Sequence, residues 1–265
     1  MKSRHRFGQH FLAPAWADKV LEAIAPRTGD RFLEIGPGPG ALTLRLAPRV
    51  AHLTAVEVDR DLASELALRL PPNAEVVTED FLDFEAGPLL AGGPLRVAGN
   101  LPYNISSPIL FKLIAIADRL TDATLMLQRE VADRLAAQPG TKEYGVLTIF
   151  VTAQADVDRV LTLPPGAFRP APKVHSAVVR LRFKPHVVPV ELRDVFGRMV
   201  RSMFTQRRKT LNNALRPFAD SIGESAPAAL QRAGIDPRRR PETLNLPDLI
   251  ALASALQPSA LSPRS

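Results

Sequence analysis

The chain has 265 residues, of which 46% are hydrophobic, and 34 Lys and Arg against 27 Asp and Glu give it a formal net charge of +7. This length predicts one large domain, or a large domain with a smaller one. No apolar run approaches the roughly eighteen residues that a membrane helix needs, and none follows the basic N-terminus as in a secretory signal. Without cysteine, and with five scattered His residues, the sequence predicts neither disulfides nor a metal site. We expect a cytoplasmic protein with no membrane partner.

The positive charge is concentrated towards the C-terminus. Residues 190–265 contain 12 Lys and Arg against 7 Asp and Glu, a net charge of +5, whereas residues 1–189 contain 22 against 20, a net charge of +2. Clusters such as QRRKT (206–210) and DPRRRP (236–241) favour a polyanionic partner. A solvated, arginine-rich helical face would have the same composition, so charge alone leaves both interpretations open.

The first hundred residues alternate short apolar runs with helix-like stretches. Strands separated by helices of this length predict a parallel sheet with right-handed crossovers, and therefore a doubly wound α/β core. The expected strands are 30–36, 52–59, 74–81 and 94–100, and the expected helices are 41–50 and 60–70.

The pattern then becomes more helical. We expect a helix over 107–120, a strand over 124–128 and a helix over 129–138. Residues 144–155 could form either a helix or a strand, because their length and their β-branched content favour different structures. Two further strands, 157–163 and 176–183, should be antiparallel because a short Pro-rich segment joins them.

A change of composition over 184–190 predicts a domain boundary. The α/β domain should cover residues 1–186, a small, basic, all-helical domain should cover 187–257, and residues 258–265 should be a disordered tail. The helices expected in the second domain are 191–204, 206–218, 226–234 and 246–256.

A glycine-rich turn lies between the first expected strand and the helix that follows. In FLEIGPGPGALT (32–43), Gly36, Gly38 and Gly40 let the backbone turn tightly and let a ligand approach it at the carboxyl ends of the strands. The spacing is not that of dinucleotide-binding folds, and the P-loop Lys is missing. A tight turn without a ligand is the alternative.

Carboxylates end the next two expected strands. Glu57 can accept hydrogen bonds from both ribose hydroxyls of an adenosine, and Asp80 can accept one from an adenine amino group. Either residue alone could instead cap a helix. Three successive strand ends that carry glycines, then Glu, then Asp favour an adenosyl ligand.

The stretch VAGNLPYNISSP (97–108) ends the fourth expected strand with chemically distinctive residues. The side-chain oxygen of Asn100 and a nearby backbone carbonyl could accept hydrogen bonds from an exocyclic amino group and favour its pyramidal transition state. Pro102 would keep Asn100 and Leu101 extended, so that their acceptors converge. Tyr103 would stack on the base. The alternative is an Asx turn ended by proline.

Several motifs together give the chain a family resemblance. It resembles the bacterial 16S rRNA adenine N6,N6-dimethyltransferases, the KsgA/RsmA family, in order from about Arg6 to Leu256. This resemblance implies a Rossmann-like class I methyltransferase fold, S-adenosyl-L-methionine as methyl donor, and dimethylation of two adjacent adenines in a hairpin loop near the 3′ end of small-subunit rRNA. The motifs are RFGQHFL, EIGPGPGALT, AVEVD, EDFLDF, GNLPYNISSPILF, MLQREVADRL, PPGAFRPAPKVHSAVVRL and FTQRRKTLNNAL.

The resemblance also implies roles for individual residues. Phe168 matches an aromatic residue that holds the flipped adenine opposite Tyr103, although it could instead anchor a loop in the core. His10 stands where the family usually has Asn, which leaves the geometry of that contact open. The implied cofactor contacts are His10, Leu12, Gly36, Glu57, Asp80 and Asn100. We expect Gly38 to contact the cofactor too, because it lies in the same glycine turn as Gly36.

We expect direct in-line methyl transfer without a metal, by a monomer that binds 16S rRNA within a small-subunit assembly intermediate. Arg207, Arg208 and Lys209 are the expected RNA-binding residues. One alternative is a 23S rRNA adenine N6-methyltransferase of the macrolide-resistance type. Another is a non-catalytic RNA-binding assembly factor on the same fold.

Overall fold

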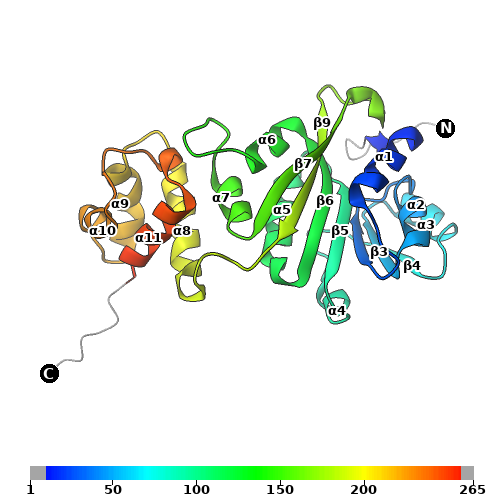
Figure 1. The fold of residues 1–265 in the computed structure, drawn as a ribbon, viewed down its shortest axis with the longest axis horizontal. Helices are drawn as coiled ribbons and strands as arrows, with labels where there is room; N and C mark the ends of the chain where they lie inside the picture. Colours follow the sequence, from blue (N-terminus) through cyan, green and yellow to red (C-terminus); the bar gives the residue numbers. More distant parts are fainter. Residues whose placement is uncertain (1–9, 258–265) are drawn as a thin grey trace. The chain divides into compact units, whose positions relative to one another are not determined.

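The computed structural model describes residues 10–257 and divides into two compact units (Figure 1). The first unit runs to Asp133 and resumes over Gln154–Pro185, and the second consists of Arg134–Ala153 and the chain from His186 onward. The chain passes into the second unit for the last time after Pro185, beside the boundary expected after residue 186. The structure differs in giving residues 134–153, expected in the first domain, to the helical unit. The expected tail, 258–265, lies outside the described residues.

The first unit is built on a seven-stranded sheet with the order β4-β3-β2-β5-β6-β9-β7. The first five of these strands are parallel, which confirms the doubly wound α/β core. Strand β9 pairs antiparallel with β7, as expected, and also with β6. The strands are β2 (Arg31–Ile35), β3 (His52–Glu57), β4 (Ala74–Thr78), β5 (Leu95–Asn100), β6 (Leu120–Gln128), β7 (Ala155–Leu163) and β9 (Ser176–Phe183).

Buried apolar side chains cover both faces of this sheet. Phe32 of β2 packs in a buried cluster with α1, whereas Leu33 and Ile35 are equally buried and point to the opposite face, because successive side chains of a strand alternate. Burial on both faces explains why β2 is almost continuously apolar. The helices of this unit are α1 (Pro14–Ile24), α2 (Thr43–Leu46), α3 (Arg60–Ala67), α4 (Gly87–Leu90) and α5 (Ser106–Ala115), while α6 (Arg129–Leu135) runs into the second unit.

The single helix expected over 41–50 is shorter in the structure. The α-helical turn α2 ends at Leu46, and a 3-10 turn follows over Ala47–Arg49. Pro48 lies within this turn and has no N–H to continue an α-helical ladder.

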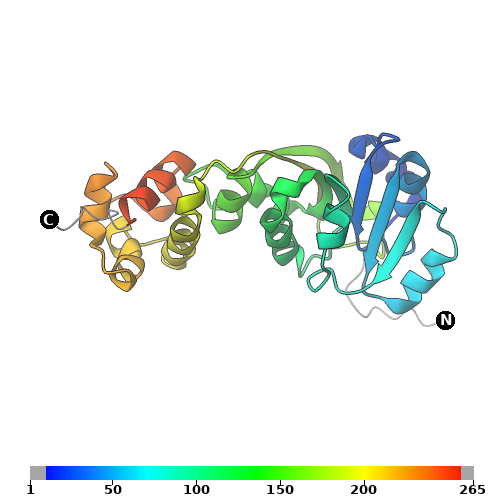
Figure 2. The same cartoon turned by 90° about the horizontal axis from the view of Figure 1, so that it is seen from below.

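The second unit surrounds a core of its own, and its C-terminal helices are yellow to red in Figure 2. This core includes Phe196, Met199, Leu215, Leu230 and Leu252, all of them buried. The helices are α7 (Val146–Thr152), α8 (Arg193–Thr205), α9 (Leu211–Ser221), α10 (Ala226–Arg232) and α11 (Leu246–Ala255). No helix within residues 10–257 is long and apolar enough to cross a bilayer.

The ambiguous segment 144–155 is a helix, α7, followed by the first residue of β7. Two contacts tie it to the second unit. The Tyr144 hydroxyl donates to the Leu244 carbonyl at 2.8 Å, and the Val187 amide donates to the Ala153 carbonyl at 3.0 Å. Tertiary packing therefore decides a structure that length and composition leave open.

The helix expected over 206–218 begins only at Leu211. Residues 206–209 form a turn in which the Lys209 amide donates to the Gln206 carbonyl at 2.8 Å, and Thr210 is extended, with φ −62° and ψ 153°. The basic cluster QRRKT is therefore presented on a loop and not on a helix.

A carboxylate is buried within the apolar strand β2. Glu34 is 2% exposed, and its Oε2 atom accepts no hydrogen bond from residues 10–257. Burial raises the pKa of Glu34 from 4.5 to about 8; the charge of Glu57 adds to this shift, and the Thr43 side chain moderates it. The carboxyl group is therefore largely protonated at neutral pH.

We expect Glu34→Gln to flatten the dependence of stability on pH. The native protein keeps a proton that the unfolded chain releases, so its free energy of unfolding should fall as pH rises between 4.5 and about 8. The variant should lose up to ~1.4 kcal/mol per pH unit of this slope. Urea denaturation at pH 5 to 8 measures it, with exposed Glu65→Gln as the control. Equal slopes in the wild type and in Glu34→Gln would contradict the assignment.

Candidate active site

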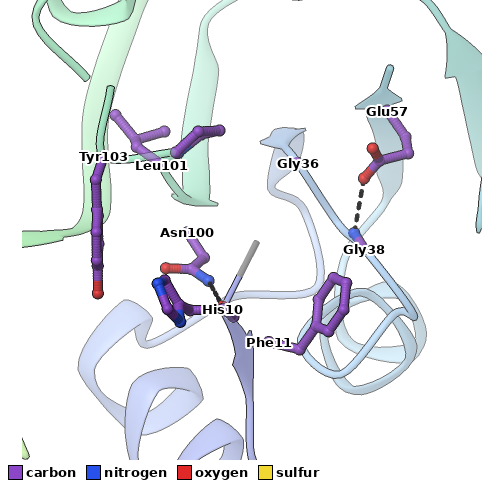
Figure 3. A pocket seen from close by; sticks show the side chains of 9 residues that line it. His10, Phe11, Gly36, Gly38, Glu57, Asn100, Leu101 and Tyr103 are labelled. Atoms are coloured by element: carbon purple, nitrogen blue, oxygen red, sulfur yellow. Dashed lines mark hydrogen bonds between the residues drawn. The ribbon is translucent and has the colours of Figure 1, made fainter. Parts of the chain in front are cut away.

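A pocket opens where the parallel strands β2, β3 and β5 end (Figure 3). It holds about 420 Å³ of empty space, its open mouth included. The position agrees with the general rule that open α/β sheets bind ligands at the carboxyl ends of their strands. Its lining residues are His10, Phe11, Gly36, Gly38, Glu57, Asn100, Leu101, Pro102 and Tyr103.

The glycine turn depends on positive φ angles, which side chains disfavour. Gly36, Gly38 and Gly40 have φ of 65°, 56° and 86°. A Cβ atom on Gly38 would come within 2.9 Å of the Phe11 ring, and one on Gly40 would come within 2.5 Å of the Leu66 side chain. Gly38 therefore allows a close approach within the pocket, whereas Gly40 allows packing against α3.

Glu57 ties the end of β3 to this turn. Its carboxylate accepts hydrogen bonds from the Gly38 amide at 2.9 Å, drawn in Figure 3, and from the Asp59 amide at 3.0 Å. Burial raises the pKa of Glu57, and the two amide bonds oppose that shift. Each carboxylate oxygen can accept more than one hydrogen bond, so Glu57 can hold the turn and still accept ligand hydroxyls.

Asp80 lies beside this site but does not line the pocket. The Glu79 amide donates to the Glu57 carbonyl at 3.0 Å, which places Asp80 just beyond the paired ends of β3 and β4. Its Oδ1 atom accepts from the Leu82 amide at 2.9 Å, as in the capping alternative. An adenine contact for Asp80 stays a prediction.

Asn100 is held in one orientation by the N-terminal segment. Its Nδ2 atom donates to the His10 carbonyl at 2.7 Å. Since the amide nitrogen is engaged there, the amide oxygen is directed elsewhere, and in Figure 3 it points to the side of the pocket where Tyr103 lies. The site therefore presents a hydrogen-bond acceptor at the end of β5.

Tyr103 is fixed at both its ring and its hydroxyl group. The ring stacks on the His10 imidazole, with centroids 5.3 Å apart, and the hydroxyl lies 2.8 Å from Ser176 Oγ. Burial raises the pKa of Tyr103, while the Ser176 bond partly opposes the shift, so the phenol stays neutral at physiological pH. Leu101 is buried, and its amide donates to the Met126 carbonyl at 3.1 Å.

The N-terminal segment reaches the pocket because it pairs with a distant loop. Strand β1 (Phe11–Leu12) is antiparallel to β8 (Phe168–Arg169). His10 Nδ1 lies 2.7 Å from the Pro170 carbonyl oxygen. A carbonyl can only accept, so Nδ1 carries the proton.

The structure places the side chains of two expected site residues outside the pocket lining. Leu12 does not line the pocket, because its side chain packs into the core and is 7% exposed; its neighbour Phe11, which the sequence reasoning missed, lines the pocket instead. The alternation of side chains in an extended strand is the signal that would have separated the two. Phe168 is fully buried in the same core cluster and is absent from the pocket lining, which agrees with the loop-anchor alternative; its base-holding role stays a prediction.

The expected RNA-binding residues differ among themselves. Arg207 forms an ion pair with Glu242 at 2.8 Å and donates to the Lys142 carbonyl at 3.0 Å, so its charge is neutralised within the second unit. Arg208 and Lys209 are exposed, and neither pairs with a carboxylate among the described residues. Only these last two are available to a polyanion.

Comparison with known proteins gives consistent results. Residues 1–245 match the family model described as ribosomal RNA adenine dimethylase. Ribosomal RNA small subunit methyltransferase A of Laribacter hongkongensis is 45% identical over 261 residues, covering 95% of this chain and 97% of that protein. The protein of the same name from Nitrosococcus oceani is 46% identical over 256 residues, covering 95% of each chain.

Two solved structures are similar over almost the whole chain. A dimethyladenosine transferase from Plasmodium falciparum has a TM-score of 0.77 and 28% identity, covering 92% of this chain and 96% of that one. The 23S rRNA methyltransferase ErmE has a TM-score of 0.68 and 28% identity, covering 94% of this chain and 100% of that one. Both support a class I methyltransferase fold with a helical C-terminal part. Because a family model matches most of its length and close relatives extend over nearly all of it, the chain belongs to the ribosomal RNA adenine dimethylase family.

Proposed function

We propose that this methyltransferase uses S-adenosyl-L-methionine to dimethylate N6 of two adjacent adenines in a hairpin loop near the 3′ end of 16S rRNA. The relatives named for the small subunit are 43% to 46% identical, whereas ErmE is 28% identical, which favours 16S over 23S rRNA. The site geometry favours an enzyme over a non-catalytic assembly factor. The observation that carries the proposal is the acceptor that Asn100 presents while His10 holds its amide nitrogen.

The pocket residues fit the proposed methyl donor. S-adenosyl-L-methionine, when bound, supplies a methyl group on a positively charged sulfur. Gly36 and Gly38 present no Cβ atom to the pocket, and the buried Glu57 carboxylate retains lone pairs for hydroxyl donors. We assign the hydroxyl contacts to Glu57 and a contact with the adenine amino group to Asp80.

The residues at the end of β5 would act on the methyl acceptor. The Pro102 carbonyl already accepts from the Ser106 hydroxyl at 2.9 Å and from the Ile105 amide at 3.2 Å. We therefore assign the Leu101 carbonyl and Asn100 Oδ1 as the two acceptors for the N6 amino group. These neutral groups orient the nitrogen lone pair and favour its pyramidal form, which is stabilisation confined to the transition state.

Tyr103 supplies the stacking surface for the flipped adenine. One face of its ring stacks on His10, so a base that used this face would displace the imidazole. A base in a hairpin loop is easier to extrude than a paired base. We infer a cytoplasmic monomer that acts on a small-subunit assembly intermediate.

The direct test of this function is mass spectrometry of rRNA. Small subunits that lack the modification should gain four methyl groups on two adjacent adenines when incubated with the enzyme and S-adenosyl-L-methionine. 23S rRNA incubated in parallel should gain none. Methylation confined to 23S rRNA would exclude the proposal.

We expect Asn100→Ala to slow single-turnover methyl transfer by about a hundredfold or more, as when one oxyanion-hole donor is removed. Asn100→Asp should also be slow, because a carboxylate cannot donate to the His10 carbonyl and would be repelled by it. Rapid-quench assays with saturating RNA and cofactor measure both. Exposed Asn104→Ala, in the same loop, is the matched control. A wild-type rate for Asn100→Ala would remove its acceptor role.

Arg208 and Lys209, which have no carboxylate partner among residues 10–257, should contribute electrostatic affinity for RNA. Replacing Arg208 and Lys209 with Ala should weaken binding and reduce its salt dependence, by ~0.9 log unit per log unit of salt for each duplex phosphate that is no longer neutralised. Exposed Arg49→Ala, in the first unit, is the control. Filter binding between low and high salt gives the slope. If the double variant keeps the wild-type slope, these residues do not contact phosphates.

The Arg207→Ala substitution should have a different effect. Removal of its ion pair with Glu242 and of its bond to the Lys142 carbonyl should lower the melting temperature of the protein. The salt slope should change less than in the double variant. A calorimetric scan that shows no destabilisation would argue that Arg207 is free to bind RNA.

A further inference from the structure

Lys112 of α5 makes an unusual set of contacts near the proposed cofactor site. Its Nζ atom donates to the Leu82 carbonyl at 2.7 Å and to the Phe84 carbonyl at 2.7 Å, and it lies 5.4 Å from the centre of the Phe81 ring. Among residues 10–257 it has no carboxylate partner. The ammonium group is therefore held by two neutral backbone acceptors and an aromatic face, a geometry that depends on the shape of one turn.

This turn, residues 80–84, begins at Asp80 just after β4. The Asp80 carbonyl accepts from the amides of Asp83 at 3.0 Å and Phe84 at 2.9 Å, and its side chain accepts from the Leu82 amide at 2.9 Å. Phe81 and Phe84 are both buried and their rings stack, with centroids 6.4 Å apart. The turn is thus held by its two buried aromatic side chains and by the hydrogen bonds that Lys112 of α5 donates to it.

Helix α5 is also joined to the segment proposed to hold the methyl acceptor. It begins at Ser106, whose hydroxyl donates to the Pro102 carbonyl at 2.9 Å. One short helix therefore contacts both the loop that follows β5 and, through Lys112, the turn that follows β4. The sheet does not couple these two directly, since β3 and β2 lie between β4 and β5.

We propose that Lys112 is a positioning residue for adenine recognition, which holds the 80–84 turn against α5 and thereby fixes Asp80 relative to the loop that carries Asn100. The inference rests on the proposed function, because it takes Asp80 as the acceptor for the cofactor's amino group. Lys112 itself does not line the pocket. Its removal should loosen discrimination at the 6-amino position of the adenine more than it affects the rest of the ligand.

The test compares two ligands that differ at this position. S-adenosylhomocysteine carries the amino group, whereas S-inosylhomocysteine carries an oxo group that cannot donate to Asp80 as the amino group does. Calorimetry gives both dissociation constants for each protein sample, and their ratio is independent of the folded fraction. In Lys112→Met the preference for S-adenosylhomocysteine should fall by roughly tenfold, the size of one hydrogen bond.

Three further variants separate positioning from general damage. Lys112→Arg keeps a donor group for the turn carbonyls and should retain most of the preference. The Asp80→Ala/Lys112→Met double variant should discriminate no worse than Asp80→Ala alone, because both act on the same contact. Lys19→Met removes an exposed lysine that lies 4.4 Å from the Trp16 ring, away from the turn, and should leave the ratio unchanged.

The outcomes distinguish this inference from the proposed function. If Asp80→Ala loses the preference and Lys112→Met keeps it, the positioning role is wrong and the cofactor proposal stands. If Asp80→Ala keeps the preference, Asp80 does not read the amino group and the role assigned to Lys112 is also wrong. A wild-type protein that binds neither ligand would overturn the cofactor proposal, and the inference with it.

Discussion

The hydrogen bond from the Asn100 amide to the His10 carbonyl determines what the pocket can do. An asparagine side chain can present a donor or an acceptor, and which of them faces a substrate depends on what the other half of the amide contacts. Here the backbone carbonyl of His10, 90 residues away in the chain, accepts the hydrogen bond from the amide nitrogen. The same segment is held by its pairing with β8 and by the His10 bond to the Pro170 carbonyl. The chemistry at the end of β5 therefore depends on a two-stranded ribbon outside the main sheet.

Two buried acids lie at and behind the pocket: Glu57 lines it, whereas Glu34 does not. Glu57 is engaged by two backbone amides, whereas Glu34 lies in the apolar interior with one oxygen unpaired and a pKa of about 8. A second full negative charge so close to Glu57 would be costly, and protonation of Glu34 avoids that cost. The arrangement leaves Glu57 as the dominant charge at the glycine turn. This electrostatic setting suits a ligand that combines hydroxyl donors with a positive charge.

The helical unit separates two uses of arginine that look alike in the sequence. Arg207 forms an ion pair with Glu242 and donates hydrogen bonds to backbone carbonyls of the 138–143 loop, so it joins segments of that unit. Its neighbours Arg208 and Lys209 project from the same turn without carboxylate partners among the described residues. The number of basic residues is therefore a poor guide to how many phosphates a surface can bind. Only the tertiary partners show which charges are already neutralised.

The sequence alone determined the doubly wound sheet, because strand and helix periodicities are local, and it located Gly36, Glu57 and Asn100 in one site, because parallel strands end at the same edge. It could not determine which neighbour in an extended pair faces the pocket, so Phe11 was missed and Leu12, whose side chain lies in the core, was expected instead. Nor could it decide whether Phe168 faces a base or the core, or whether 144–155 is helix or strand. These choices depend on contacts between residues far apart in the chain. Strand β1 pairs with β8, and α7 packs in a core that residues 134–153 form together with the C-terminal helices. Local pattern specifies the elements, while the free energy of burying their surfaces together decides the orientation of single side chains.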